Sequence, residues 1–326
     1  MSVADTISEL INSDLSPAKA HEHVRRLGSI DATSDILREA IETIECFADA
    51  EAVSTVQADF DLLDCCGTGG SGLPHYNTST TVAFILAAAG VKVAKFGNRA
   101  ATSRAGSFDL LESLGISCWL PPAHFKEIIG ETNLAFLFVQ QFYPALKKLV
   151  PIRQSVGIRT VFNLIGPLLN PARPQFRLLG VPTQGEQQAI ADYLANQSYC
   201  EKALVVTSRS GLDELDPATA NRILEIERGN IGEVLLNRKQ DFLANDKTTL
   251  NPETNCRIFT AIIHNKADEF PYYRALVCLN AGAGLCVARK ADSVEEGVFT
   301  AMELLSSGAV SKKVEQCRRV YDRYAS

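Results

Sequence analysis

Two segments, 67–80 and 95–107, are rich in glycine, hydroxyl and basic residues, which are residue types suited to binding phosphate groups. The first reads GTGGSGLPHYNTST and comes between an apolar run and an expected helix. Such a turn offers an anion bare backbone N–H donors and the positive end of the helix dipole. The second contains three basic and three hydroxyl residues, which are Lys95, Arg99, Thr102, Ser103, Arg104 and Ser107. We therefore expect a ligand with two phosphate groups.

Two adjacent carboxylates, Asp213 and Glu214, follow the strand expected at 202–208. Open α/β sheets bind their ligands at the carboxyl ends of the strands. Carboxylate oxygens there suit Mg²⁺, a hard cation that prefers oxygen ligands and substrate phosphates. The alternative is a solvated acidic turn that caps a helix, and these residues alone favour that alternative.

Arg159 is the one charged residue in the apolar run VGIRTVFNLIG. A guanidinium in such a run either extends along the surface to reach water or binds a partner in a cleft. Its planar fork of donors matches a carboxylate. Both interpretations are open at this point.

The composition is that of an ordinary globular protein, with 326 residues, 46% hydrophobic residues, 21% charged residues and a net charge of −6. An acidic chain argues against general binding of nucleic acids, which requires a broad basic surface. No apolar run approaches the length of about 18 residues that a membrane span requires, and the first ten residues lack the pattern of a secretory signal. Nine cysteines without metal-ligand spacing predict reduced core thiols and a cytoplasmic protein.

From residue 59 onward, short apolar runs alternate with helical patterns. Continuous apolar runs such as LAFLFV are typical of strands covered on both faces. The pattern predicts an α/β fold with a mainly parallel central sheet. Strands are expected at 60–66, 91–97, 116–119, 134–139, 176–181 and 202–208, and helices at 82–89, 106–114 and 186–194. Residues 244–257 are expected to be a polar connection, and 293–324 two helices divided near Gly308.

Residues 1–58 predict a small helical lobe. Apolar residues recur at helical spacing in 34–50, and Ser16 followed by Pro17 is typical of a helix start. Residues 143–172 contain four prolines and are expected to form short helices that join this lobe. The remaining segments, 59–142 and 173–326, then form the larger α/β lobe that binds the phosphates.

Together these segments resemble the anthranilate phosphoribosyltransferase family, whose fold is shared with pyrimidine nucleoside phosphorylases. GTGGSGLPHYNTST is similar to the family's phosphate loop GTGGD…NxST, and KFGNRAATSRAGSFDLLESLG to its KHGNRxxSSxxGSxDxLExLG loop. The similarity continues through GIRTVFNLIGPLLNPA, GLDEL and LNAGAGL and covers nearly the whole chain. Five ordered motifs in one chain are far more specific than one glycine-rich loop.

The resemblance implies Mg²⁺-dependent transfer of phosphoribose from phosphoribosyl pyrophosphate to anthranilate, with release of pyrophosphate, in tryptophan biosynthesis. It assigns Arg159, Asn98 and Lys95 to catalysis, with Arg159 on the acceptor carboxylate and Gly67 and Asn98 beside the acceptor. It assigns magnesium to Ser79, Asp213 and Glu214. The residues expected to hold the donor are Gly67, Thr68, Gly69, Gly70, Ser71, His75, Asn77, Ser79, Thr80, Lys95, Asn98, Arg99, Ser103 and Ser107. A homodimer formed through the helical lobe is also expected.

Four positions depart from the family pattern. Ser71 replaces the usual Asp of GTGGD, His75 a common Thr, Phe96 the His of KHGNR, and Tyr143 the His of a His-Pro-Ala motif. Phe96 and Tyr143 are expected to change the lining of the acceptor channel. One alternative is therefore a paralogue with the same donor and another aromatic acceptor. A non-catalytic nucleic-acid-binding paralogue and a nucleoside phosphorylase are further alternatives, which the retained loops and the GLDE motif fit poorly.

Overall fold

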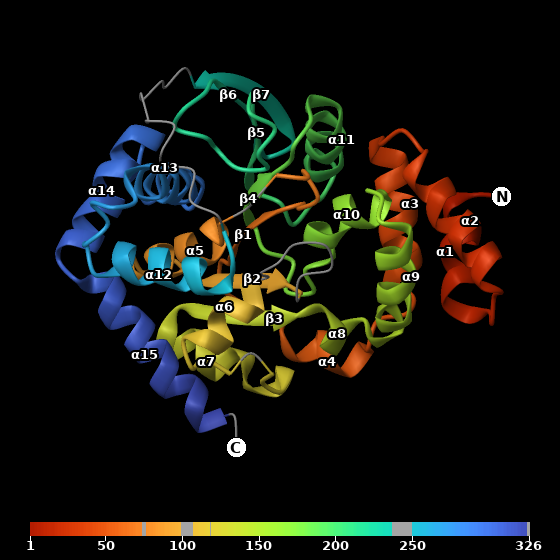
Figure 1. Cartoon of the computed structure of the whole chain (residues 1–326), viewed down its shortest axis with the longest axis horizontal. Helices are drawn as coiled ribbons and strands as arrows, with labels where there is room; N and C mark the ends of the chain where they lie inside the picture. Colours follow the sequence, from red (N-terminus) through yellow and green to blue (C-terminus); the bar gives the residue numbers. More distant parts are fainter. Residues whose placement is uncertain (74–75, 99–106, 118, 237–249, 325–326) are drawn as a thin grey trace.

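A seven-stranded sheet in the order β3-β2-β1-β4-β5-β6-β7 forms the centre of the molecule (Figure 1). The computed structural model describes residues 1–73, 76–98, 107–117, 119–236 and 250–324. Neighbouring strands from β3 to β5 run parallel, and β6 and β7 are antiparallel to their neighbours. The strands are β1 (Leu63–Gly67), β2 (Val93–Gly97), β3 (Leu134–Phe138), β4 (Phe176–Gly180), β5 (Lys202–Ser208), β6 (Asn221–Glu227) and β7 (Asn230–Leu236). The predicted mainly parallel α/β architecture is confirmed.

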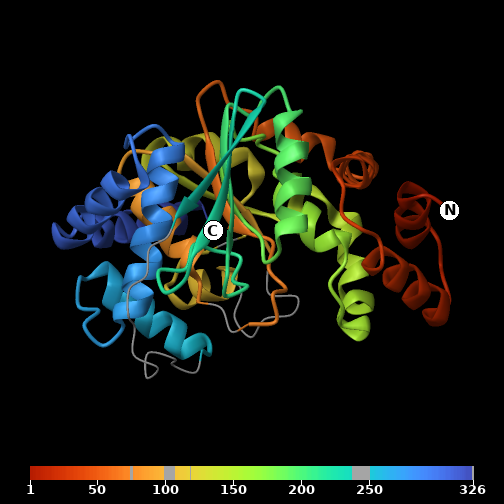
Figure 2. The same cartoon turned by 90° about the horizontal axis from the view of Figure 1, so that it is seen from above.

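Helices cover both faces of this sheet, as Figure 2 shows from above. On one face α5 (Thr78–Ala88) packs on β1, and α13 (Pro271–Val287) packs on α5, β4 and β5. On the other face α11 (Gln184–Ala195) packs on β5 and β6. Residues 82–87 of α5 are all buried, since this helix lies between the sheet and α13. The uncharged run at 82–89 thus forms a core helix.

Further helices form the carboxyl-terminal part of the chain and cover the sheet edge at β3. These are α6 (Ser107–Ser113), α7 (Phe125–Thr132), α12 (Pro252–Ile263), α14 (Val294–Ser306) and α15 (Ala309–Tyr324). The predicted division of the last two helices near Gly308 is confirmed. Gly282 of α13 and Gly297 of α14 lie so close that a β-carbon at 297 would be 2.4 Å from the Gly282 carbonyl oxygen.

The first helices of the chain lie beside the short helices of segment 139–169 (Figure 1). α2 packs on α9, and α3 packs on both α10 and α11, whereas α4 packs on α8 and η1. These elements are α1 (Val3–Asn12), α2 (Pro17–Gly28), α3 (Ser34–Glu45), α4 (Ala50–Thr55), η1 (Pro122–His124), α8 (Val139–Phe142), η2 (Pro144–Lys148), α9 (Leu149–Val156), α10 (Val161–Ile165) and η3 (Gly166–Leu169). Ser16 caps α2 as expected. The division into two lobes stays a prediction.

A buried pair of opposite charges lies within the sheet. Asp64 of β1 and Arg177 of β4 are register partners, and each is only 1% exposed. Asp64 accepts a hydrogen bond from Asn170 Nδ2 at 2.8 Å, and Arg177 Nη1 donates to the Pro167 carbonyl at 3.0 Å. Burial raises the pKa of Asp64, and the charges of Lys95 and Arg177 oppose that rise. The pair ties the segment after α10 to the sheet.

The structure corrects two expectations about local structure and adds one hairpin. The described residues of 116–119 form no strand, because the chain turns into Pro121–Pro122 and Trp119 is 62% exposed with its ring on Phe138. Residues 252–257 belong to α12, which begins at Pro252 with Asn251 as its cap, and not to a polar connection. The hairpin of β6 and β7 was not predicted at all. Its turn residues Arg228 and Gly229 both have positive φ, which suits the tight turn of a two-residue hairpin.

Among the described residues, none of the helices combines the length and the apolar character that a membrane crossing requires.

Candidate active site

The carboxyl ends of β1 and β4 meet at Gly67 and Gly180, which are register partners. A β-carbon on Gly67 would lie 2.2 Å from Asp213 Oδ2, and one on Gly180 would lie 1.7 Å from the Asp213 carbonyl oxygen. Both positions must therefore lack a side chain for the Asp213–Glu214 segment to cross the strand ends. The two adjacent carboxylates thus lie directly against the glycine-rich loop, which we define as residues 67–70.

Asp213 is bonded to this loop. Its Oδ2 accepts a hydrogen bond from the Gly69 backbone N–H at 2.7 Å. Leu215, two residues further on, is bonded to α13. The Asn280 side chain accepts from the Leu215 backbone N–H at 3.0 Å and donates to the Leu215 carbonyl at 2.9 Å. The acidic segment is therefore fixed between α13 and the glycine-rich loop. Asp213 is only 5% exposed and Glu214 is half-buried, so that the solvated-turn alternative is wrong.

Lys95 brings a buried positive charge to the same place. It is 3% exposed, and its Nζ donates to the Cys65 carbonyl at 2.7 Å and to Ser79 Oγ at 3.1 Å. Ser79 lies in the first turn of α5. Lys95 therefore joins the ends of β1 and β2 to the start of α5.

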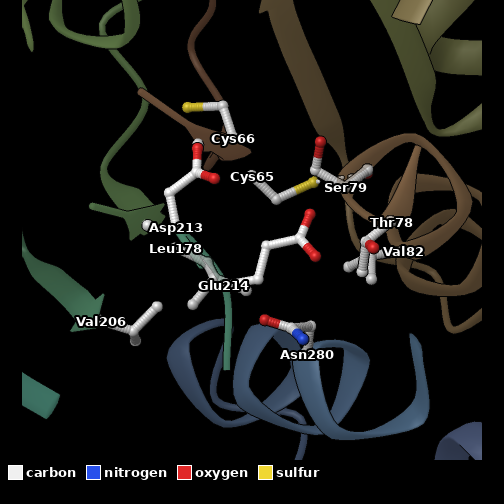
Figure 3. A pocket seen from close by; sticks show the side chains of 12 residues that line it. Cys65, Cys66, Thr78, Ser79, Val82, Leu178, Val206, Asp213, Glu214 and Asn280 are labelled. Atoms are coloured by element: carbon white, nitrogen blue, oxygen red, sulfur yellow. Dashed lines mark hydrogen bonds between the residues drawn. The ribbon is translucent and has the colours of Figure 1, made fainter. Parts of the chain in front are cut away.

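Glu214 lies in a small cavity between these elements. Figure 3 shows its carboxylate pointing into the space between Ser79, Thr78 and Asn280. The cavity has a volume of about 20 Å³ open to the centre of a water-sized sphere, enough for one water or one small ion. Burial raises the pKa of Glu214 well above its ordinary value, the neighbouring charge of Asp213 raises it further, and Thr78 and Lys95 partly oppose this.

The donors around this cavity fit a hard cation. Two carboxylates and the Ser79 hydroxyl supply oxygen ligands, and a cation beside Glu214 would offset the cost of ionising a buried carboxyl group. Cys65 and Cys66 also line the cavity, but burial raises the pKa of both thiols, that of Cys65 to about 12. Protonated thiols are poor ligands for soft metals. Within the described ranges, no three or more His, Cys, Asp or Glu residues lie close enough together to hold a metal ion by themselves.

Arg159 is held at the edge of the glycine-rich loop and does not extend into water. Its Nε donates to Glu186 Oε1 at 2.7 Å and its Nη2 to Glu186 Oε2 at 3.2 Å. The other donors reach the loop, where Nη2 bonds to Thr68 Oγ1 at 2.8 Å and Nη1 to the Gly69 carbonyl. The interpretation in which Arg159 extends along the surface to water is therefore wrong, and its binding of an acceptor carboxylate stays a prediction.

Glu186 and Asn255 are site residues that the sequence did not indicate. Glu186 follows Thr183 by three residues, a capping-box spacing that signals a helix start and says nothing about Arg159. Asn255 of α12 accepts hydrogen bonds from the backbone N–H of Asn77 at 3.0 Å and from its Nδ2 at 3.4 Å. Both contacts join segments far apart in the chain.

The other residues assigned to the donor lie in several elements around the Asp213–Glu214 segment or outside the described residues. Thr80 is fully buried in α5, and its hydroxyl has no hydrogen-bond partner among the described residues. Ser71 follows the glycine-rich loop and accepts a hydrogen bond from Leu73 N, Asn98 follows the end of β2, and Ser107 begins α6. His75, Arg99 and Ser103, and the neighbouring Thr102 and Arg104, lie outside the described residues.

Phe96 and Tyr143, two of the departures from the family pattern, lie in the core. They are 4% and 2% exposed, and their ring centroids are 6.3 Å apart in an edge arrangement. Phe142 packs against Phe96 at 6.4 Å, and the Tyr143 hydroxyl donates to the Leu169 carbonyl at 2.9 Å. The three rings form one buried cluster beneath the end of β2. Their described contacts are those of core packing and not those of an open channel.

A mainly parallel α/β sheet with a glycine-rich loop, a buried lysine and two carboxylates at its strand ends defines a phosphate-binding enzyme fold. Residues 59–311 match the model of the glycosyl transferase family, α/β domain. Anthranilate phosphoribosyltransferase from Petrotoga mobilis is 40% identical over 262 residues, which are 78% of this chain and 74% of that protein.

Solved structures agree with this match. The crystal structure of anthranilate phosphoribosyltransferase from Thermus thermophilus has a TM-score of 0.84 and 32% identity, covering 98% of this chain and 94% of that one. The enzyme from Saccharomyces cerevisiae in complex with PRPP and Mg has a TM-score of 0.82 and 23% identity, covering 98% and 92%, a likeness of fold alone. The chain belongs to the anthranilate phosphoribosyltransferase family.

Proposed function

We propose that this protein catalyses Mg²⁺-dependent transfer of phosphoribose from phosphoribosyl pyrophosphate to anthranilate, with release of pyrophosphate, in tryptophan biosynthesis. The observation that carries the proposal is the buried Asp213–Glu214 segment, bonded through Gly69 to the glycine-rich loop at the carboxyl ends of β1 and β4. A loop for phosphates and a pair of carboxylates for their metal are what a pyrophosphate leaving group requires.

Each part of the site has a role in this reaction. Asp213, Glu214 and Ser79 would hold Mg²⁺, which stabilises the charge of the departing pyrophosphate when bound. The N–H groups of residues 67–70 and the buried Lys95 would attract the phosphates of the donor. The reaction breaks the bond between the anomeric carbon and the pyrophosphate oxygen, forms a bond from that carbon to the amine nitrogen, and releases one proton from the nitrogen. The enzyme's main contribution is to align the amine with a carbon that becomes cation-like as the leaving group departs.

The remaining residues assigned to the site keep the roles that the resemblance implies. Arg159 and Asn98 would face the acceptor, with Arg159 on its carboxylate. Gly67 would lie beside the acceptor and the donor. The other donor residues are Thr68, Gly69, Gly70, Ser71, His75, Asn77, Ser79, Thr80, Arg99, Ser103 and Ser107. No general base is required, because the amine attacks a loosened ribosyl carbon.

A continuous fluorescence assay of anthranilate consumption, with phosphoribosyl pyrophosphate and Mg²⁺, tests the proposal. The expected result is turnover that stops when EDTA removes the metal. No consumption of anthranilate, with phosphoribosyl pyrophosphate still binding in calorimetry, would contradict it. A parallel screen of other aromatic acceptors for pyrophosphate release covers the alternative acceptor. The core position of Phe96 and Tyr143 removes the observation that favoured that alternative.

We also propose the division into a helical lobe, residues 1–58 with about 143–172, and an α/β lobe, and a cytoplasmic homodimer formed through the helical lobe. Ile158, 44% exposed beside Gly28 of α2, supplies apolar surface on the helical side. The eight described cysteines are all free thiols, as suits a reducing compartment. Light scattering would give the mass of a dimer, and a monomer at micromolar concentration would contradict the assembly.

A further inference from the structure

The bonds of Arg159 to the described residues fall on two edges of its guanidinium. The edge formed by Nε and Nη2 faces both oxygens of Glu186, the paired geometry in which Arg binds a carboxylate most strongly. The end formed by Nη1 and Nη2 faces the Gly69 carbonyl and the Thr68 hydroxyl. The Arg159 and Glu186 side chains are 22% and 16% exposed, so this ion pair is well shielded from water.

The protein backbone is shaped to allow this contact. Gly70 has a φ of +72°, and a β-carbon there would lie 2.8 Å from Arg159 Nη1 and 3.0 Å from Asn163 Nδ2. On the other side, Arg159 directly precedes Thr160, and Thr160 and Asn163 form the capping box that starts α10. Gly28 of α2 meets the Arg159 carbonyl closely, since a β-carbon at 28 would be 2.9 Å from it. The backbone of Arg159 is thus fixed, and Glu186 fixes the direction of its side chain.

We propose that Glu186 is a positioning residue that presents one end of the Arg159 guanidinium, and that the glycine-rich loop and the carboxylate of the acceptor share that end. The inference rests on the proposed function, in which an acceptor carboxylate binds Arg159. With Glu186 on the Nε edge, only the Nη1–Nη2 end is left for a second carboxylate. Gly69 and Thr68 occupy that end in the substrate-free protein.

The consequence is an exchange of partners. A carboxylate has two oxygens that accept from Nη1 and Nη2 in place of the Gly69 carbonyl and the Thr68 hydroxyl. Binding of the acceptor therefore releases the glycine-rich loop from Arg159, and the freed Thr68 hydroxyl can donate to a phosphate of the donor. Release of a loop by a ligand is the reverse of the ordering that ligands usually cause, which makes it a distinctive signature.

Amide hydrogen exchange of the peptide covering residues 67–70 tests the exchange of partners without catalysis. In the wild-type protein, anthranilate alone is expected to speed exchange of this peptide, whereas methyl anthranilate, which lacks the free carboxylate, leaves it unchanged. Slower or unchanged exchange with anthranilate at saturation would overturn the shared end. Calorimetry run beside it reports whether anthranilate binds at all.

Glu186→Gln tests the positioning role. The substitution keeps the size of the side chain but removes the charge. Asp192→Asn is the matched control, since Asp192 is a half-buried carboxylate of the same helix that accepts from Gln188 and not from Arg159. The expected result is a KM for anthranilate raised about ten-fold, which is the loss of one charge-assisted interaction, with kcat and the KM for phosphoribosyl pyrophosphate within about two-fold of wild type. A KM for anthranilate that falls or stays unchanged would overturn the role of Glu186.

The same variant separates this inference from the proposed function. If the wild type neither binds nor consumes anthranilate, the proposed function and the shared end both fall. Faster exchange at 67–70 in substrate-free Glu186→Gln than in Asp192→Asn would then still establish that Glu186 holds Arg159 on the loop, and equal exchange would refute it. If the wild type turns over normally and Glu186→Gln has an unchanged KM for anthranilate, the inference is refuted and the proposed function stands.

Discussion

The backbone carbonyl of Asp213 lies 1.7 Å from the position that a β-carbon would occupy on Gly180. Gly180, the last residue of β4, is therefore in direct contact with the backbone of the acidic segment at Asp213. Any side chain at 180 must push Asp213 and Glu214 away from the strand ends, since the atom it would meet is backbone and cannot rotate aside.

Gly180→Ala is expected to lower the free energy of unfolding by about 1–3 kcal/mol, as for an overpacked core, and to abolish stabilisation of the protein by Mg²⁺. Thermal unfolding with and without the metal measures both effects. Gly185→Ala is the control, because a β-carbon there meets nothing within 4 Å and the residue lies in helix α11. That control should be neutral or raise the stability by up to about 1 kcal/mol. Equal behaviour of the two variants would contradict the prediction.

Glu214→Gln should change how the stability of the metal-free protein depends on pH. The folded pKa of Glu214 is raised, so above the ordinary pKa of a carboxyl group the folded state holds a proton that the unfolded state has lost. Stability of the wild type therefore falls as the pH rises toward the folded pKa of Glu214. The variant removes this contribution and is expected to be more stable than the wild type at pH 8 without metal, with a smaller difference at pH 5.

Mg²⁺ provides the second readout for Glu214. The cation should raise the melting temperature of the wild type at pH 8 and have no such effect on Glu214→Gln, whose turnover should also be lost. Asp216→Asn would be a poor control because Asp216 is buried and bonded to Ala218 N. Asp192→Asn serves instead, since Asp192 is only half-buried and its carboxylate accepts from Gln188 on the same helix. A variant that Mg²⁺ still stabilises would remove Glu214 from the metal site.

Arg159→Ala should raise the KM for anthranilate far more than the KM for phosphoribosyl pyrophosphate. Loss of a bidentate contact to a carboxylate is expected to cost about 2 kcal/mol or more, which is on the order of thirty-fold. Steady-state kinetics with each substrate varied in turn measure both constants. An equal rise in the two would indicate that Arg159 acts only through the glycine-rich loop.

Arg177→Met should destabilise the protein by about 3–5 kcal/mol, since it removes the charge of the register partner of buried Asp64 and leaves only that of Lys95 nearby. Urea unfolding measures the change. The loss should be smaller at low pH, where Asp64 takes up a proton, because burial already raises the pKa of this carboxyl. The double variant Asp64→Asn with Arg177→Met should recover part of the loss. A single variant within about 1 kcal/mol of wild type would show that the pair contributes little.

Tyr143→Phe should lower stability by about 1 kcal/mol, because the Leu169 carbonyl loses its buried donor. The KM for anthranilate should not change, since the described contacts of Tyr143 are with the core. A large change in that KM with unchanged stability would place Tyr143 at the acceptor instead.

The sequence by itself determined the parts of this protein that depend on local patterns. Alternating apolar runs and helices predict a parallel α/β sheet, because a strand covered on both faces must be apolar throughout. The glycine-rich segment and the Asp213–Glu214 pair follow strand ends in the chain, and Lys95 lies near the end of β2. The ends of parallel strands meet at one edge, so these residues were expected to come together.

The tertiary structure decided which of these residues touch. No periodicity indicates that Glu186 faces Arg159, that Asp213 accepts from Gly69, or that Asp64 is the register partner of Arg177. Such contacts join residues from 27 to 144 positions apart, and strand register and helix packing bring them within reach. The burial that raises the pKa of Glu214 has the same origin, because desolvation depends on the elements packed around a group and not on its neighbours in sequence.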